Sequence, residues 1–74
     1  MLELRLRIRD LREDNDMNQA EMAKLLGVSQ QTYSRYESHV TDIPLESLIW
    51  LAEYYNTSVD YLLGITSRKE PYPK

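Results

Sequence analysis

The chain has 74 residues, of which 42% are hydrophobic and 28% are charged, the composition of one small globular domain rather than of a disordered chain. It contains no cysteine and one histidine, which excludes disulfides, a thiolate zinc site and a histidine cluster for a metal. The net charge of -3 is unevenly spread, because residues 41–67 contain four acidic residues and no lysine or arginine.

The N-terminal segment fits two periodicities. Apolar residues alternate with charged ones, as in a half-buried strand, at Leu2, Leu4, Leu6 and Ile8. A helical stripe that continues to Leu11 extends further, so we predict a helix over about residues 4–14. Leu2 and Leu6 then lie off its core face, either exposed or against a partner chain. Arginines interrupt the segment, so we expect no signal peptide, no membrane span and a cytoplasmic protein.

Two helices separated by a short turn are predicted next. Asn18 and Glu21 have the spacing of a capping box, and Gly27 is suited to ending the helix that they begin. Ser29 caps a following helix that extends to about Glu37. At about 100° per residue, the tyrosines of that helix face the core and its long polar side chains face outward. The polar face consists of Gln30, Gln31, Ser34 and Arg35.

Two further helices complete an all-α chain. Pro44 fits the first position of a fourth helix, and Ser58 caps a short fifth helix that ends before Gly64. The fourth helix has an apolar stripe at Leu45, Leu48, Leu51, Ala52 and Tyr55. We expect one domain over residues 1–64 and a short extended tail over residues 65–74, which contain two prolines.

The motifs occur in an order that resembles a known family. The segments "MNQAEMAKLLGVSQQTYSRYE" (17–37) and "LESLIWLAEYYNTSVDYLLG" (45–64) together resemble the Cro/CI-type (XRE, phage-repressor-like) helix-turn-helix family. The resemblance covers about residues 8–64. It implies a compact five-helix, lambda-repressor-like DNA-binding domain whose third helix enters the major groove of double-stranded DNA.

Roles for individual residues follow from this resemblance. The expected base contacts are Gln30, Gln31, Ser34 and Arg35, and the chemistry agrees because glutamine pairs with adenine and arginine with guanine. The expected phosphate contacts are Arg12, Asn18, Gln19 and Ser38. Members of the family often pair an arginine of the first helix with the glutamate that closes the third, so we also expect a structural pair between Arg12 and Glu37.

The loop after Glu37 departs from the family pattern. The family usually has Asn-Gly and a basic residue there, whereas this chain has Ser-His-Val-Thr-Asp at positions 38–42. His39 occupies the position where the family's glycine adopts a left-handed conformation. The absence of the family's basic residue removes a phosphate contact. Glu37, His39 and Asp42 are a poor ligand set for zinc, so we expect no metal site. Nothing orients His39 toward a nucleophile, so we expect no catalysis.

Trp50 lies off the apolar stripe of the fourth helix. It is either a contact for another protein or an isolated exposed aromatic residue.

Our first hypothesis is a sequence-specific transcriptional regulator, a repressor that binds a pseudo-palindromic operator as a homodimer. It needs no cofactor and no small-molecule substrate. The alternative is a protein-interaction module of the same fold, antitoxin-like or anti-repressor-binding, with a protein partner and weak DNA binding.

Overall fold

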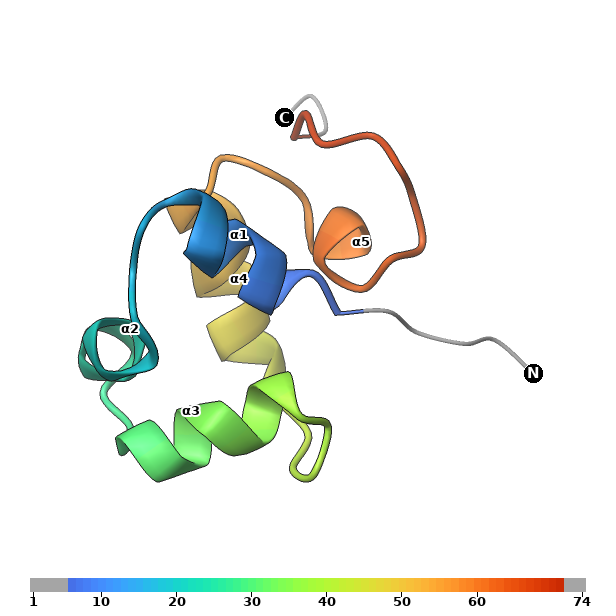
Figure 1. The fold of residues 1–74 in the computed structure, drawn as a ribbon. Coiled ribbons are helices and arrows are strands. Elements are labelled where there is room, and N and C mark those ends of the chain that lie inside the picture. Colours follow the sequence, from blue (N-terminus) through green and yellow to red (C-terminus); the bar gives the residue numbers. More distant parts are fainter. Residues whose placement is uncertain (1–5, 72–74) are drawn as a thin grey trace. The chain divides into compact units, whose positions relative to one another are not determined.

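The computed structural model describes residues 6–71, which form five α-helices and no strand (Figure 1). The helices are α1 (Ile8–Asp14), α2 (Gln19–Leu26), α3 (Gln30–Glu37), α4 (Leu45–Tyr54) and α5 (Val59–Leu62). The all-α prediction is confirmed. Residues 9–43 form one compact unit, and the described residues on either side of it, 6–8 and 44–71, form another. No helix within the described range is long and apolar enough to cross a membrane.

The helix-turn-helix of the first unit is set by local capping interactions. Asn18 Oδ1 accepts the backbone N–H of Glu21 at 2.8 Å, and the Glu21 carboxylate accepts the backbone N–H of Asn18 at 3.0 Å. Gly27 ends α2 in the left-handed conformation, with φ of 73°. Ser29 Oγ then accepts the backbone N–H of Thr32 at 3.1 Å and begins α3. The predicted capping box, turn glycine and serine cap are all confirmed.

Buried aromatic residues fix the rotation of α3 about its own axis. Tyr33 and Tyr36 are buried, and their rings meet edge to face with centroids 6.4 Å apart. Met22 and Ala23 of α2, which packs against α3, are buried as well. The opposite side of α3 is therefore turned toward solvent, as the angular pattern of the sequence predicts.

In the second unit, α4 and α5 pack against each other. Their buried residues are Leu48, Leu51, Ala52 and Leu62. Pro44 precedes the helix as its N-cap instead of occupying the first helical position, because its ψ of 147° is extended. Leu45 is 66% exposed, so the buried stripe begins one turn later than the spacing suggests. Ser58 Oγ accepts the backbone N–H of Tyr61 at 3.1 Å, which confirms the predicted cap of α5.

The predicted start of the first helix, at about residue 4, is wrong. Leu6 and Arg7 are not helical, and α1 begins at Ile8. The backbone N–H of Arg7 donates to Leu62 O at 2.9 Å, and its guanidinium donates to the carbonyls of Tyr61 and Thr66 at 2.8 and 2.6 Å. These long-range bonds hold Arg7 in a non-helical conformation, which a local periodicity does not reveal. The predicted contacts of Leu2 lie outside the described residues.

Candidate nucleic-acid interface

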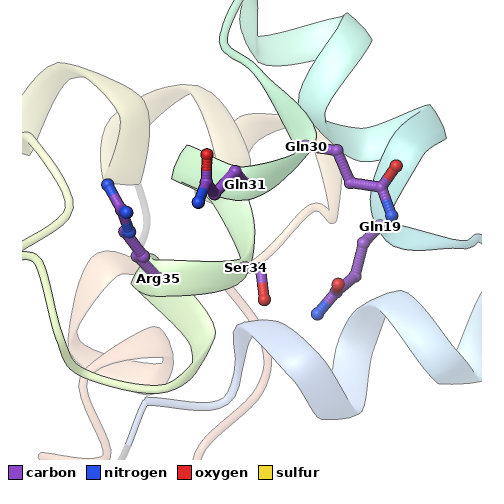
Figure 2. A pocket seen from close by; sticks show the side chains of 5 residues that line it. All are labelled: Gln19, Gln30, Gln31, Ser34 and Arg35. Carbon is purple, nitrogen blue, oxygen red and sulfur yellow. The ribbon is translucent and has the colours of Figure 1, made fainter.

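The polar face of α3 forms an open hollow on the surface of its unit (Figure 2). Gln30, Gln31 and Arg35 are exposed and Ser34 is half-buried. Together with Gln19, from the start of α2, they surround a volume of about 490 Å³. Figure 2 shows the Gln30 side chain extended toward the start of α2, and the Arg35 side chain one turn further along α3. The structure thus brings all four predicted base-contacting residues onto one surface.

This surface offers hydrogen-bonding groups that suit base edges. Each glutamine amide is both a donor and an acceptor, and the Arg35 guanidinium presents several donors in a plane. An α-helix with its side chains is about 10–12 Å across, which matches the width of the DNA major groove, about 12 Å. The eight residues of α3 span about 12 Å, enough to present two successive turns to the bases.

Gln19 is oriented by the end of α3. Its side-chain nitrogen donates to the Glu37 carboxylate at 3.1 Å, and its side chain lines the same hollow as Gln30 and Ser34. The amide is half-buried rather than fully exposed. Gln19 is predicted to contact phosphate, but its bond to Glu37 is not predictable from the sequence, because residues 18 positions apart carry no periodic signal of contact.

Asn18 and Ser38 stand at the ends of the two helices. The capping box uses the side-chain oxygen of Asn18, which is exposed. The Ser38 hydroxyl donates to Ser34 O at 3.0 Å and caps the last turn of α3, and Ser38 is also exposed. Both residues are accessible, and each contributes to the helix end on which it lies.

Arg12 and Glu37 form the expected ion pair, and it is almost fully buried. The guanidinium donates to both carboxylate oxygens, at 2.7 and 3.1 Å, and the two side chains are 11% and 4% exposed. A third donor of Arg12 binds Met17 O at 2.8 Å. The pair therefore links α1, the segment before α2 and the end of α3, and it holds the carboxylate that orients Gln19.

Glu37 is ionised because its neighbours outweigh its burial. Burial by itself raises the pKa of this carboxyl group, whereas Arg12, Tyr33 and Gln19 lower it, and the net pKa lies below its ordinary value. The pKa of Arg12 is raised, chiefly by its hydrogen bond to Glu37. Tyr33 is predicted from the sequence only as a core residue, and its place beside this carboxylate is a finding of the structure.

The unit that contains the hollow has a net negative charge, whereas DNA-contacting surfaces are usually basic. Residues 9–43 contain four basic and seven acidic residues, and Arg9 is paired with Glu13 at 2.8 Å. The loop after α3 contributes no lysine or arginine. His39 in this loop adopts the left-handed conformation that glycine favours, with φ of 62°. Among residues 6–71 no group of three or more His, Cys, Asp or Glu side chains could hold a metal ion.

The residues predicted to contact a protein do not line this hollow. Trp50 is 37% exposed on α4, and Leu6 is half-buried. Leu2 precedes the part of the chain that the structure describes.

Comparisons with known proteins agree with the helix-turn-helix fold. The family model for helix-turn-helix proteins matches residues 8–62. The uncharacterized HTH-type transcriptional regulator YobD of Bacillus subtilis (strain 168) is 35% identical over 65 residues, 88% of this chain and 58% of that protein. The cryptic phage CTXphi transcriptional repressor RstR of Vibrio cholerae is 39% identical over 58 residues, 78% of this chain and 52% of that protein.

A solved structure is similar as well. The crystal structure of a transcriptional regulator from Listeria innocua is matched with a TM-score of 0.82 and 28% identity, over 90% of this chain and 64% of that one. This match supports the five-helix architecture over most of the chain. The chain spans little more than half the length of the curated relatives named above.

Proposed function

Because the chain belongs to the Cro/CI-type helix-turn-helix family, we propose that it is a sequence-specific, double-stranded DNA-binding transcriptional regulator. In this proposal it represses transcription by occupying a pseudo-palindromic operator as a homodimer in the cytoplasm, and it needs no cofactor. Residues 1–64 form the DNA-binding domain, and residues 65–74 form a tail. The observation that carries the proposal is the exposed polar face of α3, held outward by the buried tyrosines behind it.

The first turn of α3 reads bases in this proposal. Gln30 and Gln31 follow the Ser29 cap directly, and recognition helices contact base edges through their N-terminal residues. Each amide pairs with adenine N6 and N7, while Arg35 pairs with guanine O6 and N7 from the next turn. A good bidentate pair discriminates against a wrong base by about 1–3 kcal/mol.

Phosphates are contacted from the helix ends. Asn18, Gln19 and the N-terminus of α2 face one strand, because backbone N–H groups at a helix start favour an anion. Ser38 contributes a hydroxyl at the end of α3. Arg12 has mainly an indirect role, since its guanidinium donates hydrogen bonds to Glu37 and to Met17 O. Its part is to hold the carboxylate that orients Gln19.

Homodimerisation offsets the shortage of positive charge. A monomer with one exposed arginine on α3 makes few ionic phosphate contacts, and DNA affinity depends strongly on such contacts. Two copies double each contact and place two recognition helices about 34 Å apart. The same shortage of charge favours the alternative function, a protein-interaction module of this fold with weak DNA binding.

Selection from random duplex DNA at near-physiological salt tests the proposal. Wild type is compared with the double variant Gln30→Ala/Gln31→Ala and with Arg68→Ala, a control that removes an exposed cation from the tail. We expect wild type and the control to enrich the same palindromic motif, and the double variant to enrich none. Circular dichroism establishes that each variant is folded.

The other outcomes discriminate between the hypotheses. If folded wild type enriches no motif, sequence-specific DNA binding is contradicted, and the protein-interaction module is the remaining hypothesis. A motif without two-fold symmetry contradicts the homodimer but not base reading by α3. If the Gln30→Ala/Gln31→Ala variant enriches the same motif as wild type, residues other than these glutamines recognise the DNA sequence.

A further inference from the structure

The solvent-facing side of α4 carries an apolar surface that includes none of the proposed DNA contacts. Four large residues are exposed on this ten-residue helix: Leu45 at 66%, Ile49 at 46%, Trp50 at 37% and Tyr54 at 46%. We call these residues, together with the exposed Glu46 and Glu53, the α4 surface. Scattered apolar residues are common on proteins, but a cluster on one helix marks an interaction site.

The aromatic part of the α4 surface is organised before any partner arrives. The rings of Trp50 and Tyr54 stack with centroids 5.0 Å apart and an angle of 12° between their planes. Tyr54 in turn meets Tyr55 edge to face at 5.2 Å. These contacts restrict side-chain motion, so a partner that docks here loses little free energy in ordering the rings. Buried tryptophan and tyrosine side chains contribute strongly to protein interfaces.

The charge on the α4 surface is entirely negative. Glu46 and Glu53 are exposed on the same helix as the apolar residues. No lysine or arginine occurs between Arg35 and Arg68 in the sequence, so neither α4 nor the loops that directly adjoin it contain one. A complementary partner therefore presents apolar side chains flanked by basic ones.

A second copy of the chain does not fit this pattern well. In a two-fold symmetric dimer, the same patch meets itself. Antiparallel pairing of two α4 helices centred between Ile49 and Trp50 places Glu46 opposite Glu53 of the other copy, twice in the interface. Like charges placed in contact across an interface are destabilising.

We propose that the α4 surface docks a basic amphipathic segment of another protein, with its apolar residues on Trp50 and Ile49 and its lysines or arginines at Glu46 and Glu53. This inference stands on residues 45–55 alone and does not depend on DNA binding. It supplies a route by which a protein partner acts on the chain.

A synthetic amphipathic helical peptide of leucine and lysine is the probe. Trp50 is the only tryptophan in the chain, so its fluorescence reports binding directly. We expect the peptide to shift Trp50 emission to shorter wavelength and to protect it from iodide. Two matched peptides, one with glutamate for lysine and one with serine for leucine, are expected not to bind. Ile49→Ser and Glu46→Gln/Glu53→Gln are each expected to weaken binding by roughly tenfold.

The control variant is Asp14→Asn/Asp16→Asn, which removes two exposed carboxylates outside the α4 surface. We expect it to bind the leucine-lysine peptide as wild type does. Equal weakening by the control, or equal binding of the serine-lysine peptide, would show attraction to net negative charge alone and overturn the proposal. A concentration-dependent dimer in sedimentation that Trp50→Ser abolishes would instead assign the surface to a second copy. No binding by folded wild type also overturns it.

Discussion

Glu37 is the residue on which the geometry of the α3 surface depends. Arg12 neutralises it from α1, Gln19 donates to it from α2, and Tyr33 lies beside it in the core. A buried carboxylate with this many partners is stable only while they remain, since removal of one leaves an uncompensated charge. The position of the Gln19 amide is therefore tied to a buried ion pair.

We expect Arg12→Ala to lower the free energy of unfolding by about 3 kcal/mol, because it leaves Glu37 buried without its cation. Urea denaturation at neutral pH measures the change. Arg9→Ala is the matched control, since its pair with Glu13 lies on the surface with side chains 69% and 54% exposed. A change below about 0.5 kcal/mol is expected for the control. Similar losses in both variants would contradict the importance assigned to burial.

Because of the same pair, the difference in unfolding free energy between wild type and Arg12→Ala depends on pH. The pKa of Glu37 is lowered in the folded chain, so its ionised form stabilises the fold above its ordinary pKa of 4.5. That contribution is lost as the pH falls from about 4.5 through the lowered pKa of the folded state. We therefore expect the two stability curves to converge below pH 4.5, whereas a constant gap would exclude Glu37 as the cause.

Among the elements, those with local determinants are the ones that the sequence predicts correctly. The capping box at Asn18, the turn at Gly27 and the caps at Ser29 and Ser58 each involve residues close together in the chain. The start of α1 depends instead on bonds from Arg7 to residues 54 and 59 positions away. The polar face of α3 follows from helical spacing, whereas the bond between Gln19 and Glu37 follows only from packing.

The loop between α3 and α4 contains a conformation that its sequence does not favour. His39 has φ of 62°, and a left-handed backbone costs roughly 1 kcal/mol for a residue with a Cβ atom. We expect His39→Gly to raise the free energy of unfolding by about 0.5 kcal/mol, after allowing for the greater freedom of glycine in the unfolded chain. Thermal denaturation measures this change. Val40→Gly changes an exposed neighbour without positive φ and is expected to lower the stability of the fold. A gain in stability in both variants would exclude the left-handed conformation of His39 as the cause.

On the scale of the whole molecule, the net negative charge is expected to limit the DNA affinity of the proposed regulator. We expect Asp42→Lys to raise affinity for random duplex DNA and to steepen the dependence of log K on log salt by about 1, because it adds a phosphate contact in the loop after α3. Fluorescence anisotropy at several salt concentrations measures both quantities. Glu53→Lys makes the same change of charge on α4, and equal effects would show that net charge alone is responsible.

The bond between the Arg7 backbone and Leu62 also has a consequence for synthesis on the ribosome. Residues 9–43 find their partners within a continuous stretch of chain, whereas Arg7 binds residues that are translated much later. Ribosomes add about 5–20 residues per second, so the acceptor for Arg7 is made roughly 3–11 s after Arg7 itself. The chain up to Glu37, the end of the helix-turn-helix, is made within that interval, about 1–5 s before Leu62. The helix-turn-helix segment is therefore complete before Leu62, the acceptor for the Arg7 backbone, has been made.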